Sequence, residues 1–176
     1  ENNYCDIISM SYLFLSCTEK FLFNIDWVNM LTINKILNLP HDFNVLVEYS
    51  VHEKFRFLKR LYDEFEMGKN QFSGVGEALF EARLNQQLVA ICGLNQDTFS
   101  QDDQIGRLRR FYVHPEYRQQ GIGQATLEAV EAYAHNYFKV LHLYTDTENA
   151  AKFYRKMGYS FFVDEQSNYR KNLLNF

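Results

Sequence analysis

Two different spacings of apolar residues along the chain predict both helices and strands. Between residues 42 and 67 the apolar side chains recur every three or four positions, which is typical of amphipathic helices. A break near Ser50 divides this region into two predicted helices, and Gly68 is suited to ending the second one. Ahead of them, residues 31–37 form a candidate first strand, which ends before Pro40.

Three strands are predicted after a polar loop. Residues 78–84 alternate between apolar and polar side chains, as a strand with one buried face does. Residues 88–94 are almost continuously apolar, which is typical of a central strand covered on both faces. The third strand is expected over residues 107–113.

The remaining pattern alternates helix and strand. A helix over residues 121–138 is apolar except for one polar stripe, so it is expected to lie against a sheet with this stripe in solvent. The stripe consists of Gln124, Glu128, Glu131 and His135. After it we expect a strand over 140–145, a helix over 149–157 and a strand over 159–163, and the tail to Phe176 is a candidate last edge strand. The fold class is therefore α/β.

Composition limits the possible functions. The chain has 176 residues, of which 47% are hydrophobic and 23% charged, as in one ordinary globular domain. Its formal net charge of −4 argues against general nucleic-acid binding, which relies on Lys and Arg neutralising phosphates. Cys5, Cys17 and Cys92 lack the spacing of a metal site, so we interpret them as reduced thiols of a cytoplasmic protein without a metal.

The first 29 residues differ from the rest. Their two apolar runs are separated by Glu19 and Lys20, and neither approaches the ~20 apolar residues that cross a bilayer. No pattern of a secretory signal is present, and no membrane association is expected. We interpret residues 1–29 as an extension and residues 30–176 as the folded domain. An extra N-terminal helix packed on that domain is the alternative.

Residues 107–123 carry the candidate chemistry. Gly121 and Gly123 permit close approach of a ligand to the backbone, and the amides of residues 119–123 are expected at a helix N-terminus beside Arg118. These groups suit a pyrophosphate. A dinucleotide fingerprint is excluded because Thr126 replaces its third glycine, and the Gly-Lys-Ser/Thr of a P-loop is absent. The pyrophosphate arm of coenzyme A remains.

Two motifs resemble those of the GNAT superfamily of acyl-CoA N-acyltransferases. Arg118-Gln119-Gln120-Gly121-Ile122-Gly123 is similar to its Gln/Arg-x-x-Gly-x-Gly/Ala signature, and residues 149–159 are similar to its second, Phe-Tyr-containing helix. The resemblance implies a mixed central sheet flanked by helices. It also implies direct transfer of an acetyl group from acetyl-CoA to a primary amine in a ternary complex. The oligomeric state stays open, with a dimer plausible.

The same resemblance implies roles for individual residues. The strand residues Phe111, Tyr112 and Val113 would bind the pantetheine through their backbone, and an amide near Val113 would stabilise the oxyanion. The whole signature from Arg118 to Gly123 would hold the pyrophosphate. Asn149 and Phe153 would lie along the cofactor, and Tyr154 would protonate the departing thiolate.

Other interpretations stay open beside these. Tyr154 is alternatively a core aromatic, Asn149 a helix cap and His114 a turn residue. Many members of the superfamily carry a Glu on the strand before the signature, where this chain has Arg109 and Arg110.

The general base is therefore unassigned, with Glu77, Glu81 and Asp97 as candidates. Regular strand alternation allows only one of the two arginines to face the acceptor, and that arginine would favour a substrate bearing a carboxylate or phosphate. A non-catalytic acyl-CoA-binding module is the alternative function.

Overall fold

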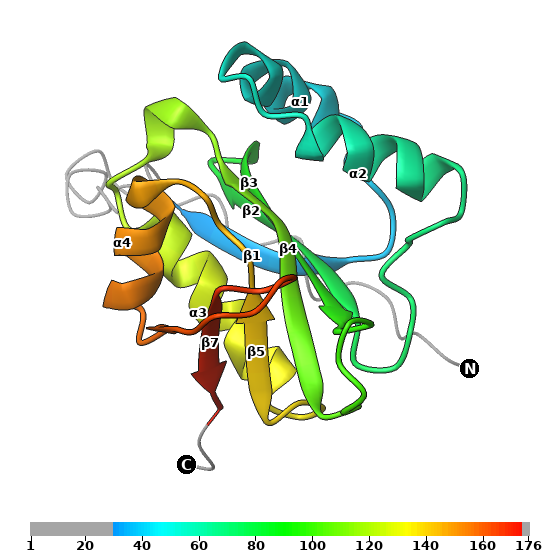
Figure 1. Cartoon of the computed structure of the whole chain (residues 1–176). Coiled ribbons are helices and arrows are strands. Elements are labelled where there is room, and N and C mark those ends of the chain that lie inside the picture. The colour runs from blue at the N-terminus through cyan, green and yellow to red at the C-terminus, as the bar shows by residue number, and fades with distance from the viewer. Residues whose placement is uncertain (1–29, 174–176) are drawn as a thin grey trace, which may run out of the picture. The chain divides into compact units, whose positions relative to one another are not determined.

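The computed structural model describes residues 30–173, and in this part seven strands form one sheet with helices on both faces (Figure 1). The elements are β1 (Leu31–Ile36), α1 (Phe43–His52), α2 (Phe57–Glu66), β2 (Ala78–Leu84), β3 (Gln87–Gln96), β4 (Ile105–Val113), the 3-10 turn η2 (Pro115–Tyr117), α3 (Ile122–Ala134), β5 (Val140–Leu143), α4 (Glu148–Lys156), β6 (Ser160–Phe161) and β7 (Tyr169–Asn172). Residues 1–29 lie outside the described part, so their interpretation as an extension stays a prediction.

The sheet is mixed, as the resemblance implied. Its strand order is β1-β2-β3-β4-β5-β7-β6, and β4 and β5 form its parallel pair, while the other neighbours are antiparallel. The prediction of an edge strand in the tail is wrong, because β7 lies between β5 and β6. All four residues of β7 pair with β5, and the two-residue strand β6 is left at the edge.

The two faces of the sheet carry separate apolar clusters. Helices α1 and α2 cover one face, where Phe43, Leu46, Leu58 and Leu61 pack against β2, β3 and β4. Helices α3 and α4 cover the other face, as Figure 1 shows. The predicted break in the first helical region is confirmed, slightly later than Ser50: α1 ends at His52 and α2 begins at Phe57.

Helix α3 confirms most of its predicted polar stripe and corrects one member. Gln124 and Glu128 are exposed, but the Glu131 side chain is only 12% exposed. Its carboxylate pairs with the Lys171 ammonium at 2.6 Å, because β7 brings Lys171 to this side of the helix. Glu131 is therefore a tertiary ion-pair partner instead of a solvated residue.

Residues 30–173 contain neither a membrane-spanning helix nor a cluster of metal ligands. None of the helices there is both long and apolar enough to cross a membrane. In the same residues, no three His, Cys, Asp or Glu side chains gather in a way that would hold a metal ion. Cys92 is a buried free thiol, while Cys5 and Cys17 lie outside the described residues.

Candidate active site

β4 and β5 are neighbours over only a short stretch. Their parallel register joins Ile105, Gly106 and Arg107 to residues 140–142. Beyond Arg107, β4 continues to Val113 without β5 beside it. Beyond Arg107, the edge of β4 on the β5 side is thus not covered by a strand. This register agrees with the divergence of the two strands that the resemblance implied.

The backbone of Val113 is directed toward this uncovered edge. The His114 amide donates to the Val89 carbonyl at 2.8 Å, so these two residues form a hydrogen-bonded pair of the β3–β4 ladder. Pairs alternate in an antiparallel ladder, and the next pair, Val113 with Ala90, therefore directs its N–H and C=O groups away from its partner strand. The Val113 amide is consequently placed where a bound ligand can meet it.

A β-bulge interrupts β4 just before this position. Ile91 pairs with Tyr112 and Gly93 with Arg109, so Cys92 alone opposes two residues, Arg110 and Phe111. Arg110 has a φ of 58°, which is rare for a residue other than glycine. The extra residue shifts the alternation of side chains from here to the end of the strand.

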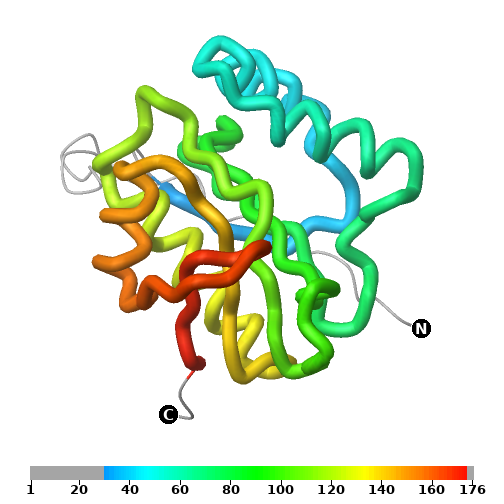
Figure 2. Tube along the Cα trace, viewed as in Figure 1, coloured from blue at the N-terminus to red at the C-terminus, as the bar shows by residue number. Residues whose placement is uncertain are grey.

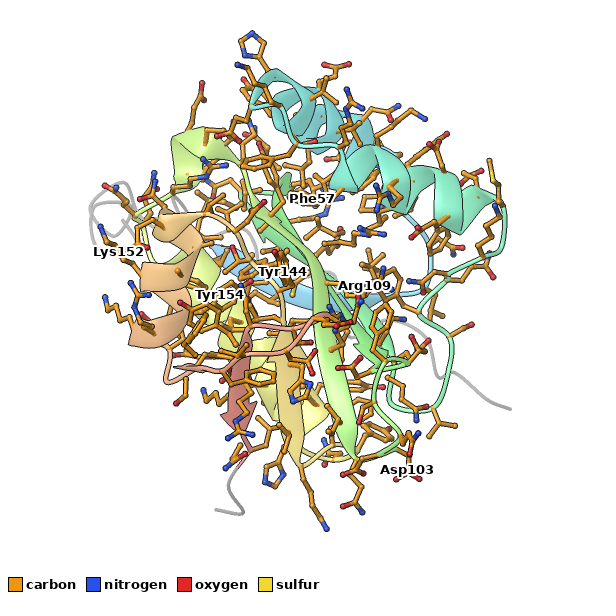
Figure 3. The ribbon with its side chains drawn as sticks, viewed as in Figure 1. Phe57, Asp103, Arg109, Tyr144, Lys152 and Tyr154 are labelled. Carbon is orange, nitrogen blue, oxygen red and sulfur yellow. The ribbon has the colours of Figure 1, made fainter. Side chains whose placement is uncertain are left out.

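The bulge corrects the expectation that only one arginine faces the acceptor side. Leu108 packs in the cluster below α3 and α4, so Arg109, its neighbour in regular strand, faces α1 and α2. Arg110 also faces α2, because its guanidinium donates to Glu64 at 2.8 Å. Figure 3 shows Arg109 on the α2 side of β4. Both arginines therefore lie on one face.

The start of α3 presents open backbone donors. Gly121 is the N-cap residue with a φ of 81°, and no side chain caps the helix. The first helical bond runs from the Ala125 amide to the Gly121 carbonyl, which leaves the amides of residues 122–124 without helical partners. A Cβ built at Gly121 would meet no atom within 4 Å. The open amides thus begin slightly later than the sequence suggested, next to open space that suits a phosphate group.

The loop between β4 and α3, whose course Figure 2 traces, is exposed in its second half. Gln119 has a φ of 63°, and the Gln120 side chain donates to the Glu116 carbonyl at 2.9 Å. His114 is buried, with its Nδ1 accepting from the Glu116 amide at 3.3 Å. Burial lowers the pKa of His114, and the residue holds the turn. This agrees with its interpretation as a turn residue.

Arg118 is already engaged within the protein. Its guanidinium donates to both carboxylate oxygens of Glu53 at 2.6 Å each, and its Nε donates to the Val113 carbonyl at 3.0 Å. Glu53 also accepts from the Tyr112 hydroxyl at 2.5 Å. The hydrogen bonds from Arg118 hold the pKa of Glu53 below its usual value. A pyrophosphate that binds Arg118 must therefore share it with Glu53 or displace it.

The interpretation of Asn149 as a helix cap is wrong. The cap of α4 is Thr147, whose hydroxyl accepts from the Ala150 amide at 3.4 Å, while Asn149 lies exposed in the first turn. One turn further along, the Phe153 ring packs on Phe111 of β4 with ring centroids 6.0 Å apart. A Cβ at Gly123 would lie 3.7 Å from the same Phe153 ring, so this ring joins α4 to both β4 and the start of α3.

Tyr154 is more buried than Phe153. Only 8% of it is exposed, and it packs edge-on against Tyr159 with centroids 5.4 Å apart. Figure 3 shows it on the α4 side of the sheet, opposite Arg109. Burial raises the pKa of its hydroxyl, with a smaller contribution from Cys92. The side chain is therefore part of the core and also a phenol that keeps its proton at neutral pH.

The three candidate bases all have structural partners. Glu77 accepts from the amides of Gly74 and Gln96 at 3.1 and 3.2 Å, and Glu81 accepts from Arg83 at 3.0 Å. Asp97 is 2% exposed and contacts Arg107 and His142, the latter at 3.0 Å. None of the three is a free carboxylate beside the uncovered edge of β4.

Two hollows in the described surface lie elsewhere. One, of about 400 Å³, is lined by residues around Gly158 and Lys171, and the other, of about 320 Å³, by residues around Asp103 and Tyr137. Neither includes the bulge of β4 or the signature loop. The site described above therefore rests on strand register and backbone geometry instead of an enclosed cavity.

Comparison with known proteins agrees with this geometry. Residues 74–161 match the family model described as an acetyltransferase (GNAT) domain, which is half of the chain. The chain belongs to the GNAT acetyltransferase family. No curated protein sequence matches it significantly.

Solved structures of GNAT-type proteins share the fold. A proposed acetyltransferase from an Exiguobacterium species is 26% identical with a TM-score of 0.73, over 81% of this chain and 93% of that one. An acetyltransferase from Streptococcus agalactiae is 20% identical with a TM-score of 0.63, over 81% and 98% of the two chains. A protein from Klebsiella pneumoniae, described as a proposed acyl-CoA N-acyltransferase, is 21% identical with a TM-score of 0.60, over 82% and 99%.

One polar network of this GNAT domain gave no signal in the sequence. Arg107 donates to the Ser167 hydroxyl at 2.7 Å and to the Gln166 carbonyl, and it also contacts Asp97. These contacts fasten the segment between β6 and β7 to the first half of β4. Ser167 and Gln166 lie 60 and 59 residues from Arg107 along the chain, so no local motif could have indicated these two contacts.

Proposed function

We propose that this chain is an N-acetyltransferase that moves an acetyl group from acetyl-CoA to a primary amine by direct attack. The observation that most supports this proposal is the register of β4, which continues to Val113 after its pairing with β5 has ended. It leaves the Val113 amide directed toward the uncovered edge of β4, close along the chain to the open amides of α3. Membership of the GNAT family supports acyl transfer in general.

The residues present fit acetyl-CoA as a co-substrate. The backbone of Phe111 and Val113 would bind the pantetheine amides as an added strand does. The amides of residues 122–124, the loop from Arg118 to Gln120 and the space at Gly121 would receive the pyrophosphate. Asn149 and Phe153 on α4 would lie along the pantetheine.

Transfer requires one bond to form and one to break. The amine nitrogen attacks the thioester carbonyl, and a backbone amide near Val113 would donate a hydrogen bond to the oxyanion that develops. When the C–S bond breaks, the nitrogen loses a proton and the sulfur gains one. A tyrosine hydroxyl carries its proton at neutral pH, so Tyr154 would donate a hydrogen bond to the departing thiolate and supply this proton. Burial raises the pKa of Tyr154, which makes it a weaker acid than an exposed tyrosine.

The acceptor must reach the thioester as a neutral amine. Carboxylates that would act as a base are occupied, and the pKa of Glu53 is lowered, which makes it a weaker base. None of the described residues is therefore assigned as the general base.

The test is a transfer assay with the full chain. Acetyl-CoA is mixed with a panel of primary amines, release of the CoA thiol is followed, and the acetylated amine is identified by mass spectrometry. We expect transfer to at least one amine class above the rate of acetyl-CoA hydrolysis. Binding of acetyl-CoA without transfer to any amine in the panel would contradict the proposal.

That outcome would favour the second candidate, a non-catalytic acyl-CoA-binding module. One observation supports it: within the described residues, β4 carries three arginines and no carboxylate. A binding module needs the groups that hold acyl-CoA, but it needs no residue that activates an acceptor amine. It would therefore retain acetyl-CoA affinity that is insensitive to Tyr154→Phe and show no turnover.

A further inference from the structure

Arg109 differs from the two arginines beside it on β4. Arg110 is paired with Glu64 at 2.8 Å, and Arg107 is held by Asp97 and Ser167. Among the described residues, none supplies a hydrogen bond or an ion pair to the Arg109 guanidinium. Arg109 thus adds a positive charge to this face without a matching carboxylate.

The position of Arg109 on the sheet follows from its partner on β3. It lies directly across from Gly93, and a Cβ at Gly93 would come within 2.4 Å of the Phe72 ring, which belongs to the cluster under α1 and α2. Directly opposed residues of a pair share a face, so Arg109 projects toward α2. The absence of a side chain at Gly93 and the presence of Phe72 shape the surroundings of this guanidinium.

The electrostatic surroundings of Arg109 are mainly positive. Burial lowers its pKa, and repulsion from Arg110, and to a smaller extent from Arg107 and Arg60, acts in the same direction. Glu64 is the one carboxylate that opposes this effect, and it is already bonded to Arg110. A partly buried cation in such surroundings is stabilised by an anion from outside the protein.

We propose that Arg109 binds a carboxylate carried by the acceptor amine, so that the substrates are amino acids or related carboxylated amines. This inference rests on the proposed function. A guanidinium offers two parallel N–H donors that match the two oxygens of a carboxylate. In a chain of net charge −4, this local positive face also attracts anionic acceptors preferentially.

The position along β4 suggests how the acceptor spans the site. Arg109 and Val113 are four residue steps apart along the strand, which is at most about 13 Å. The long arginine side chain covers part of that distance. Acceptors in which several bonds separate the amine from the carboxylate are therefore the first to compare, as a series of ω-amino acids of increasing length.

The experiment compares each ω-amino acid with the alkylamine of equal length, in the parent protein and in Arg109→Gln. We expect the parent to prefer the carboxylated acceptor, and Arg109→Gln to raise its KM roughly tenfold or more, with kcat nearly unchanged. The KM of the alkylamine and the affinity for acetyl-CoA should stay the same. Arg170→Gln removes an exposed arginine from β7 and serves as the control of equal charge.

Two further measurements distinguish failure of the role proposed for Arg109 from failure of the proposed acetyl transfer. Arg109→Lys retains the charge without the paired donors, so it should recover only part of the preference. Calorimetry with the N-acetylated ω-amino acids measures carboxylate binding without turnover, and it applies even if no amine is acetylated. Equal affinity of the parent and Arg109→Gln for these ligands would overturn the role of Arg109. An equal rise in KM for the ω-amino acids and the alkylamines would overturn it as well.

Discussion

Arg118 and Glu53 form a paired contact in which both carboxylate oxygens accept from the guanidinium at 2.6 Å. The pair joins the segment after α1 to the loop that precedes α3. Because Glu53 also accepts from Tyr112, one carboxylate connects β4 with the loop that precedes α3. This contact gives the first prediction.

Arg118→Gln should weaken acetyl-CoA binding roughly tenfold, because a charge-assisted contact to phosphate is lost. Glu53→Gln should instead strengthen it, since it removes the carboxylate that competes for Arg118. Calorimetry with acetyl-CoA measures both, and circular dichroism verifies the fold. Unchanged affinity in Arg118→Gln would place the pyrophosphate elsewhere, while equal losses in both variants would show that the pair only holds the loop.

Gly121 allows a comparison with a matched glycine. Gly121 and Gly68 both have positive φ, 81° and 68°, and at each a Cβ would meet no atom within 4 Å. Valine at either position should therefore cost a similar strain, of about 1–2 kcal/mol in the free energy of unfolding. Only Gly121→Val is expected to reduce acetyl-CoA affinity, by tenfold or more, because its side chain fills the space predicted for a phosphate.

Thermal unfolding of the two variants measures the loss of stability, and calorimetry measures their affinity for acetyl-CoA. Gly68 lies just after α2, at the end of that helix remote from the signature loop, so its variant reports the backbone strain alone. A similar drop in acetyl-CoA affinity in Gly68→Val would mean that general destabilisation explains the result, and the phosphate site at Gly121 would be rejected.

Features encoded by local sequence could be predicted well. The order of strands and helices, the break between α1 and α2, and the glycine at the start of α3 agree with the spacing of apolar residues and glycines. The signature loop could be recognised because all of its residues are adjacent in the chain. Short-range patterns are therefore sufficient for the family and for locating the signature loop.

Features that depend on distant partners could not be predicted. The bulge at Arg110 changes the face of every later residue of β4, and a positive φ at an arginine leaves no pattern in the sequence. Glu53 meets Arg118 over a separation of 65 residues, and Glu131 meets Lys171 over 40. These pairings follow from strand register and helix packing, which only the folded chain defines.

His114 predicts how stability depends on pH. Its pKa is lowered by burial, and its Nδ1 accepts from the Glu116 amide, so the folded state favours the neutral ring. The unfolded chain then binds more protons below the ordinary His pKa of about 6.5, and the free energy of unfolding falls as pH drops below that value.

Between about pH 7 and pH 5, where an ordinary His titrates, the parent should therefore lose more thermal stability than His114→Gln, which does not titrate. Melting curves of both proteins across this range measure the difference. Parallel curves would show that protonation of His114 does not oppose folding.

Tyr154 and Tyr159 provide the last prediction. Their rings pack edge-on in one cluster, and the buried Tyr159 hydroxyl interacts with the Glu131 carboxylate. Replacing either tyrosine by phenylalanine removes one oxygen and keeps the ring, so the effects on packing should be alike and small. Only Tyr154 is proposed to contact the departing thiolate.

Tyr154→Phe should lower kcat roughly 10²-fold with little change in acetyl-CoA affinity, because proton donation acts in the transition state. Tyr159→Phe should leave kcat within about twofold, since a packing change of this kind acts on stability and not on the reacting atoms. The loss in Tyr154→Phe should become smaller with an acyl donor whose thiol is more acidic, because such a thiolate needs less stabilisation. Steady-state kinetics of both variants with the two donors decide the question. Equal kcat in the parent and Tyr154→Phe would leave Tyr154 as a packing residue, and a loss independent of the leaving thiol would assign it to a step other than departure of the thiolate.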